Sequence, residues 1–168
     1  MKHSILIIVT FGIIACSQTK KNNSDLNTVA NHKEDTIQLD TNFREGDIVF
    51  QTSGSGQSHA IQLATHSPYS HCGILIEKDN QLYVLEAVQP VKFTPIDQWI
   101  KRGDDHYCVV KRLLKADSIL QPENITKMRK LAASYEGKNY DLPFEWSDEK
   151  LYCSELVYKM YERTTGIQ

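Results

Sequence analysis

The chain has 168 residues, of which 40% are hydrophobic, and a formal net charge of −2 at pH 7. This length suits one compact domain with a sizeable core, and the near-neutral charge lacks the basic field that binds nucleic acid. The four cysteines form neither a CxxC pair nor a zinc-ligand pattern, so we expect no disulfide framework and no structural zinc.

The beginning of the chain resembles a bacterial lipoprotein signal. A positively charged start is followed by an apolar run over 4–14, which is too short to span a membrane. Ile13-Ile14-Ala15-Cys16 resembles a lipobox, and this resemblance implies cleavage before Cys16 and lipidation of that residue. A core helix is the alternative, but the abrupt change to a polar run at Ser17 argues against it. We therefore predict a signal peptide over 1–15 and a location in the bacterial cell envelope, anchored to the membrane by lipid.

Residues 16–42 are polar and poor in aromatics, which predicts a flexible tether to a domain over 43–168. Periodicity and turn residues predict strand 48–50, helix 58–65, a hairpin of strands 70–77 and 81–87, helix 96–101, strand 107–113, helix 124–135 and a helix beginning near Cys153. The run 53–56 lacks the lysine of a phosphate-binding loop and is expected to be a connector, and 138–150 a loop. This order is typical of an α+β domain with helices packed on a small antiparallel sheet.

The predicted hairpin brings a histidine close to a carboxylate. Successive side chains of a strand face opposite sides, so Cys72 lies on the other face from His71 and is expected to be buried and inert. A tight turn makes His71 and Glu86 near cross-strand neighbours. Glu86 follows the largely apolar run 82–85, where a carboxylate is unusual unless it has a partner. The alternatives are a solvent-exposed edge position for Glu86 and an ordinary structural role for His71.

Cys153 is placed where a helix begins. The unpaired N–H groups and positive dipole end of a helix stabilise a thiolate, which is the nucleophilic form of cysteine. The alternative is a small core residue, as most free cysteines are. A thiol at a helix start, a histidine and a carboxylate are the components of nucleophilic catalysis. We therefore predict Cys153 as nucleophile, His71 as base and Glu86 as the group that orients the base.

Four motifs in this order resemble the YiiX/YaeF-like branch of the NlpC-type cysteine hydrolases. They are GDIVF at 46–50, SHCGI at 70–74, LEA at 85–87 and YCSELV at 152–157. The resemblance implies a circularly permuted papain-like fold, with the nucleophile helix at the C-terminal end and the histidine before the cysteine in the chain. It also implies the catalytic roles of Cys153, His71 and Glu86, and an oxyanion hole that uses the backbone N–H of Cys153.

Three residues are candidates for substrate binding. Tyr140, Asp141 and Tyr69 are expected as pocket walls near the thiol, because aromatics and a carboxylate suit an amine-bearing peptide. Ordinary packing is the alternative for each of them. Members of the family usually continue beyond the cysteine helix, whereas this sequence ends at Gln168, which bears on substrate recognition more than on the catalytic residues.

Other histidines do not form a recognisable metal site. His59, His66 and His106, together with His71, repeat no known ligand spacing, so we expect neither a metal nor a cofactor. Whether Cys72 and Cys108, on strands expected to be neighbours, form a disulfide in an oxidising envelope stays open.

We predict an envelope-anchored cysteine hydrolase that cleaves an amide bond and has no nucleic-acid partner, and the family resemblance implies peptidoglycan stem peptides as its substrate. A binding module that captures a peptide or amino acid without turnover is one alternative, and a lipid acyl hydrolase or acyltransferase is another. A fast-reacting thiol favours the hydrolase over the binding module. A polar groove at the thiol favours an amide substrate, whereas a wide apolar channel favours lipid.

Overall fold

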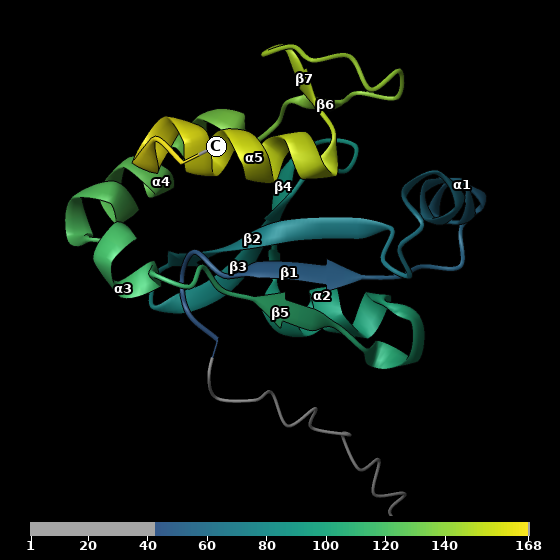
Figure 1. The fold of residues 1–168 in the computed structure, drawn as a ribbon, viewed down its shortest axis with the longest axis horizontal. Coiled ribbons are helices and arrows are strands. Elements are labelled where there is room, and N and C mark those ends of the chain that lie inside the picture. The colour runs from purple at the N-terminus through teal and green to yellow at the C-terminus, as the bar shows by residue number, and fades with distance from the viewer. Residues whose placement is uncertain (1–42, 168) are drawn as a thin grey trace, which may run out of the picture. The chain divides into compact units, whose positions relative to one another are not determined.

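The structure is a computed structural model that describes residues 43–167. The predicted signal peptide over 1–15, the lipidation of Cys16 and the tether over 16–42 lie outside these residues. Within them, an antiparallel sheet is covered by helices, which confirms the predicted α+β class (Figure 1). No helix in the described part of the chain is both long and apolar enough to cross a bilayer.

Five strands form the main sheet. They are β1 (Ile48–Gln51), β2 (His71–Lys78), β3 (Gln81–Glu86), β4 (Lys92–Pro95) and β5 (Val109–Lys111), in the spatial order β4-β3-β2-β1-β5. All neighbouring pairs are antiparallel. The turn between β2 and β3 uses Asp79 and Asn80 at φ values of 54° and 59°, the left-handed backbone that a two-residue hairpin turn requires. The predicted strands 48–50, 70–77 and 81–87 are confirmed to within one residue, whereas the strand predicted over 107–113 forms only at its centre.

Strand β4 is absent from the prediction because prolines bracket it. Pro90 precedes the strand and Pro95 ends it, but β4 lies at the edge of the sheet, where a missing N–H breaks no internal ladder. It pairs with β3, and Lys92 lies opposite Glu86. Strand β3 is therefore internal, and the alternative of Glu86 on an exposed edge strand is excluded.

The helices are α1 (Gly56–Thr65), α2 (Ile96–Arg102), the 3-10 turn η1 (Asp104–His106), α3 (Ala116–Ile119), α4 (Pro122–Tyr135) and α5 (Cys153–Thr165). Strands β6 (Asn139–Tyr140) and β7 (Lys150–Leu151) form a separate parallel pair around the predicted loop 138–150. The prediction of 53–56 as a connector is wrong at its end, because Gly56 already belongs to α1. Ser55 caps that helix by accepting a hydrogen bond from the backbone N–H of Ser58 at 3.1 Å.

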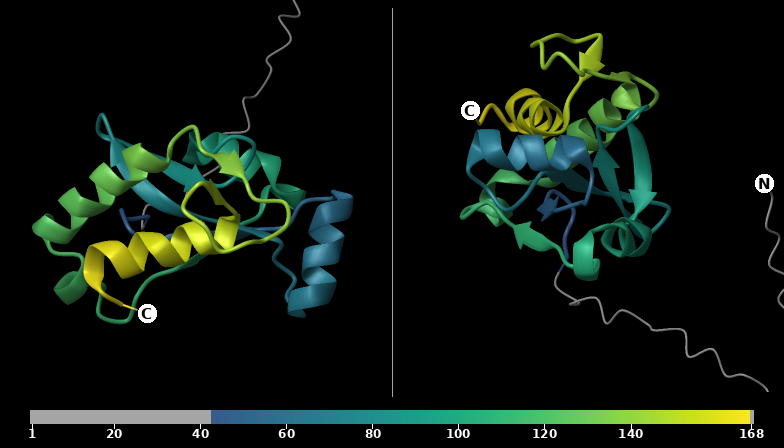
Figure 2. Two further views of the ribbon diagram at one scale, coloured as in Figure 1. Left: turned by 90° about the horizontal axis from the view of Figure 1, so that it is seen from above. Right: turned by 90° about the vertical axis from the view of Figure 1, so that its right-hand side faces the viewer.

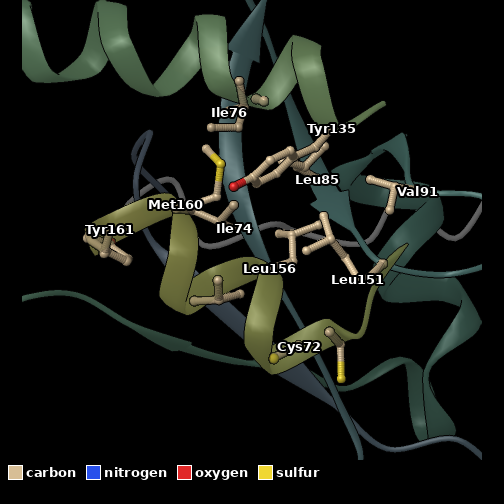
Figure 3. Packing of buried hydrophobic residues seen from close by; sticks show 14 of the residues in the cluster. Cys72, Ile74, Ile76, Leu85, Val91, Tyr135, Leu151, Leu156, Met160 and Tyr161 are labelled. Atoms are coloured by element: carbon tan, nitrogen blue, oxygen red, sulfur yellow. The ribbon is translucent and has the colours of Figure 1, made fainter. Parts of the chain in front are cut away.

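The larger core lies between the sheet and helices α4 and α5. Figure 3 shows Ile74, Ile76 and Leu85 of the sheet packed with Leu156 and Met160 of α5. The two helices contact each other and cover the same face of the sheet (Figure 2). Full burial of these side chains fixes α5 against β2.

A smaller core covers the opposite face of the sheet. Leu75 of β2 and Val84 of β3 pack there against Trp99 of α2, and all three are fully buried. Strand β2 is therefore buried on both faces, which explains its nearly continuous apolar sequence. Residues at the start of β2 can consequently contact elements packed on either face of the sheet.

The N-terminus of α5 is anchored by buried charges. Glu155 accepts hydrogen bonds from the backbone N–H of Ser147 at 3.2 Å and of Tyr152 at 3.3 Å. Lys159, which is 1% exposed, pairs with Glu155 at 2.6 Å and with Asp148 at 2.9 Å. Removing one partner from a buried pair typically costs about 3–5 kcal/mol, so this cluster fixes the position at which the helix begins.

Candidate active site

Cys153 is the first residue of α5, as predicted. Tyr152, immediately before it, has extended backbone angles and serves as the N-cap. The thiol therefore lies at the end of the helix where backbone N–H groups lack helical partners and the dipole is positive. The side chain is 7% exposed, so solvent competes little for its hydrogen bonds.

His71 is the first residue of β2 and contacts Glu86 of β3. The Nε2 of His71 lies 2.7 Å from Oε2 of Glu86, which confirms the predicted cross-strand contact. The register pairs Ile74 with Leu85, which places Glu86 opposite Gly73 and makes its contact with His71 diagonal. A Cβ on Gly73 would lie 2.4 Å from a Val84 methyl carbon, so only glycine lets β3 approach closely here.

Glu86 is fully buried and surrounded by donors that the sequence pattern does not identify. Thr94 donates to Oε1 at 2.6 Å, the Trp99 indole N–H donates to Oε2 at 3.0 Å, and Arg102 binds both oxygens. Burial alone would raise the pKa of Glu86, but the hydrogen bonds from His71, Arg102 and Thr94 outweigh it and lower the pKa to about 2. The carboxylate is therefore charged over the working pH range. The only sequence signal for these partners is the unusual carboxylate itself, which requires compensation.

His71 and Cys153 lie close enough for each to shift the pKa of the other. Glu86 occupies Nε2 of the imidazole, so Nδ1 is the ring nitrogen that remains available. Burial lowers the pKa of His71, but its bonds to Cys153 and Glu86 outweigh this and raise the pKa to about 9. The three side chains predicted from sequence thus converge, and His71 is not an isolated structural histidine.

The sulfur of Cys153 is held as a thiolate. A hydrogen bond from the thiol of Cys72 lowers its pKa most, burial opposes this, and His71 lowers it further, to about 4. The pair is consequently a thiolate and an imidazolium between about pH 4 and pH 9. Cys153 is also a member of the buried core cluster, so its lowered pKa is what distinguishes it from an ordinary core cysteine.

Cys72 is buried, as predicted, and belongs to the same core cluster as Cys153. Its bond to Cys153, together with burial, raises the pKa of the Cys72 thiol well above its ordinary value. Cys72 and Cys108 are free thiols. The expectation that they lie on neighbouring strands is wrong, because β1 separates β2 from β5, and the two residues belong to opposite faces of the sheet.

A pocket of about 460 Å³ opens beside His71. Ten of its fourteen lining residues carry polar side chains, namely Gln51, Ser53, Ser55, Gln57, Ser58, Ser70, His71, Gln89, Arg102 and Tyr140. Burial, followed by the charge on Cys153, raises the pKa of Tyr140 to about 12, so its hydroxyl keeps its proton. The phenol oxygen accepts a hydrogen bond from Gln57 at 3.3 Å. Tyr140 therefore lines the pocket as predicted and can donate to a ligand.

A second pocket, of about 300 Å³, is lined mainly by apolar side chains. The residues that line it are Ile48, Phe50, Cys72, Leu113, Ser154, Val157, Tyr158, Tyr161 and Ile167. This pocket adjoins Cys72, whereas the polar pocket adjoins His71.

The other two substrate-binding candidates lie outside the lining of the polar pocket. Tyr69 packs its ring against Phe50 at a centroid distance of 5.9 Å. Asp141 is 1% exposed, and neither carboxylate oxygen has a hydrogen-bond partner among residues 43–167. Its charge contributes to raising the pKa of Tyr140 and of Tyr152, which places the orphaned carboxylate near both phenols. The Asp141 carboxylate is thus buried, unpartnered among the described residues and outside the pocket lining, and Tyr69 is not part of that lining either.

In the part of the chain that the structure describes, no three or more His, Cys, Asp or Glu residues are placed to hold a metal ion. His59, His66 and His106 do not gather around His71 there.

Selective alkylation tests the thiolate directly. At pH 6, iodoacetamide should label Cys153 about tenfold faster than Cys108, because a ~1,000-fold greater ionised fraction is partly offset by lower intrinsic nucleophilicity. Burial raises the pKa of Cys108, which keeps that thiol protonated. The labelling rate of Cys153 should be nearly constant from pH 5 to 8 and fall as its pKa of about 4 is approached from above. Peptide mapping by mass spectrometry gives both rates; a Cys153 rate that rises tenfold per pH unit between 6 and 8 would contradict the assignment.

Residues 42–168 match a protein family described as permuted papain-like amidases, YaeF/YiiX, C92 family. The uncharacterized protein YiiX of Escherichia coli K12 is 48% identical over 123 residues, which cover 73% of this chain and 59% of that protein. A crystal structure described as the metalloprotein YiiX of Escherichia coli O157:H7 superposes with a TM-score of 0.68 at 48% identity, covering 74% of this chain and 67% of that one. The chain thus spans less than two thirds of the length of the curated relative.

Proposed function

The chain belongs to the YaeF/YiiX family of permuted papain-like amidases, and we propose that it cleaves an amide bond in peptidoglycan stem peptides by a Cys-His-Glu mechanism. We further propose that a lipid on Cys16 holds the enzyme at the bacterial envelope, where such peptides occur. Family membership accounts for the general class, a cysteine amidase of permuted papain-like fold. The hydrogen bond between His71 and the buried Glu86, together with Cys153 at the start of α5, is the observation that carries the mechanism.

The first half of the reaction forms an acyl-enzyme. The thiolate of Cys153 attacks the carbonyl carbon of the amide, and the electron pair of the C=O bond moves to oxygen. The backbone N–H of Cys153, at the helix start, is suited to stabilise that oxyanion. The imidazolium of His71 then gives its proton to the leaving amine as the C–N bond breaks.

The second half releases the acyl group. Neutral His71 takes a proton from water, whose oxygen attacks the thioester carbonyl, and the C–S bond breaks to regenerate the thiolate. Glu86 keeps the ring of His71 oriented and stabilises its charged form in both halves. Since Arg102, Thr94 and Trp99 hold the carboxylate, the imidazole has a rigid support.

The polar pocket supports a peptide substrate. Its lining of hydroxyl and amide side chains can pair with peptide groups. The charge of Arg102 in this lining is already taken up by Glu86. The unpartnered carboxylate of Asp141 would suit the free amine of a stem peptide that reaches past the lining of this pocket. The polar side chains of the lining favour a cell-wall peptide, although apolar atoms make up most of its exposed surface.

The apolar pocket favours one other candidate, a lipid acyl hydrolase. An acyl chain could occupy its 300 Å³, and its lining includes Ser154, next to Cys153, but not His71. The pocket beside His71 contains the proposed base, and neither lining includes Cys153 itself. We therefore rank the amide substrate first.

The proposal is tested by incubating the purified protein with soluble peptidoglycan fragments and following the products by mass spectrometry. Hydrolysis of one amide bond should give two fragments whose summed mass equals that of the substrate plus one water. Protein treated with iodoacetamide at pH 6 is the matched control and should give no product. Hydrolysis of a fatty acyl ester instead of the peptide would select the lipid alternative, and binding measured by calorimetry without turnover would select the binding module.

Asp141 is expected to select substrates with a free amine. Acetylating that amine should lower kcat/KM by about tenfold to a hundredfold, because a buried carboxylate would lose its charged hydrogen-bond partner. The variant Asp141→Asn should act on the free and acetylated peptides at similar rates. The kcat/KM ratio of the two peptides, measured on both proteins, decides the point; an unchanged ratio in the variant removes Asp141 from substrate recognition.

A further inference from the structure

Gln51 is a buried residue whose side-chain amide has no partner in the fold. It ends β1, it is 2% exposed, and its Oε1 is enclosed without a hydrogen bond. Its Nε2 makes no hydrogen bond within residues 43–167 either, but unlike Oε1 this nitrogen is not sealed from solvent. Because an unpaired polar group in the interior is costly, native proteins seldom keep one without a function.

The register of the sheet places Gln51 beside the proposed base. Gln51 pairs with His71 across β1 and β2, and residues directly opposite each other in an antiparallel pair share one face of the sheet. Both residues line the polar pocket of about 460 Å³. Since Nε2 is the open end of the amide, it is the end that faces this pocket.

The enclosed end of the amide lies against Gly103, between α2 and η1. A Cβ on Gly103 would lie 2.7 Å from Oε1 of Gln51 and 3.4 Å from its Cβ, so the glycine provides the space for this end. The backbone of Gln51 is also held, because its carbonyl accepts a hydrogen bond from the N–H of Ser70 at 3.1 Å. The side chain is therefore fixed from behind and open on the pocket side.

Other polar side chains of the pocket already have protein partners. The hydroxyl of Ser58 donates to that of Ser70. The guanidinium of Arg102 binds both carboxylate oxygens of Glu86. Gln51 differs from these residues because its donors are unused, and a ligand in the pocket can pair with them at no cost in internal hydrogen bonds.

We propose that Gln51 is a substrate-binding residue whose Nε2–H donates to a peptide carbonyl on the leaving-amine side of the scissile bond. The inference rests on the proposed function, in which His71 gives its proton to the leaving amine. The pocket that His71 lines then receives the part of the substrate that carries this amine. The leaving group is accordingly an amino-acid residue or a peptide. A simple alkylamine has no carbonyl and would leave the buried donor unpaired, which is how such a site discriminates.

The test measures binding of a peptidoglycan stem peptide without turnover, by calorimetry on the Cys153→Ala protein. Gln51→Met and Gln51→Leu are added separately to this parent protein, and each replaces the amide by an apolar side chain of similar size. Gln81→Met is the matched control, because Gln81 is an exposed glutamine at the start of β3. Thermal unfolding of each protein without peptide measures the contribution of the residue to stability.

The Kd for the peptide should rise about tenfold in both Gln51 variants and stay at the parent value in Gln81→Met, because the complex loses one hydrogen bond shielded from water. The unfolding temperature of the Gln51 variants should equal or exceed that of the parent, since an apolar group replaces an unpaired polar one. A peptide with CH₂ in place of the carbonyl should bind the parent about tenfold more weakly, and Gln51→Met should not distinguish the two peptides.

A parent-like Kd in both Gln51 variants would overturn the proposal. Weaker binding together with a lowered unfolding temperature would show a structural role and overturn it as well. Binding that depends on Gln51, combined with no cleavage by the wild type, would contradict the amidase chemistry and leave the role of Gln51 intact. A parent protein that does not bind the peptide would refute the peptide substrate and this role together.

Discussion

The variant Cys153→Ala is expected to lose about 10⁴-fold or more in kcat, since removal of a catalytic nucleophile leaves only binding and oxyanion stabilisation. The substitution deletes one sulfur atom and keeps a residue that favours helix, so α5 should still begin at position 153. Loss of activity would therefore report chemistry and not unfolding. The measurement is the initial rate of product formation from peptidoglycan fragments, followed by mass spectrometry.

The control variant is Cys108→Ala, which removes a thiol that lies away from the site and should keep full activity. Calorimetry adds a second readout, because Cys153→Ala should still bind the peptide with nearly wild-type affinity if the pocket is intact. Equal rates for Cys153→Ala and the wild type would refute the nucleophile assignment, even if the peptide is bound.

The variant Glu86→Gln is expected to lose both activity and stability. The amide keeps the shape of the side chain but leaves Arg102 without its anionic partner, and breaking such a pair costs about 3–5 kcal/mol when it is deeply buried. Since Arg102 is 40% exposed on its side chain, we expect a loss near or below the lower end of that range. His71 loses the carboxylate that favours its charged form, and kcat should fall by roughly 10²–10⁴. Initial rates and thermal unfolding measure the two effects.

The pH dependence of activity and of stability tests the charged states of His71 and Glu86. The imidazolium of His71 is present below its pKa of about 9, so the alkaline limb of the activity profile should lie there and move to lower pH in Glu86→Gln. Glu86 has a depressed pKa of about 2 against an ordinary 4.5. Its contribution to stability is therefore complete above pH 4.5 and is lost as the pH falls toward 2. Glu86→Gln has no carboxylate to protonate, so its stability should not show this loss between pH 4.5 and 2.

A matched control for Glu86 is Glu123→Gln, which removes an exposed carboxylate paired with Lys127 on the surface of α4. Such a pair contributes little, so activity and unfolding temperature should stay close to those of the wild type. If Glu86→Gln behaved like this control, the carboxylate would have no part in orienting His71.

Local pattern was sufficient for most of the elements near the site. The apolar, β-rich runs and the turn at Asp79 and Asn80 specify the β2–β3 hairpin, and a two-residue turn sets its register. The contact between His71 and Glu86 follows from that register because both residues belong to one hairpin. The start of α5 at Cys153 follows from local helix signals, and the burial of Cys72 follows from strand alternation.

Some elements depend on contacts that are distant in sequence. Strand β4 forms despite its flanking prolines because the edge of β3 offers hydrogen bonds that no local pattern reveals. Strands β6 and β7 are two residues each, and they form because Tyr140 lies opposite Leu151 across a long loop. Short elements of this kind carry too little periodicity to be recognised.

Local sequence was enough to predict the hairpin, the cysteine at a helix start and the three candidate catalytic side chains, because each depends on residues close together in the chain or on motifs kept in order. The packed structure was needed to show that Arg102, Thr94 and Trp99 donate hydrogen bonds to Glu86, that Cys72 lies in the same buried core as Cys153, and that Tyr69 packs against Phe50. These contacts cannot be read locally because a side chain's partners across a sheet are set by how helices α2 and α5 dock on its two faces. Docking depends on the sum of many buried contacts, which no single stretch of sequence contains.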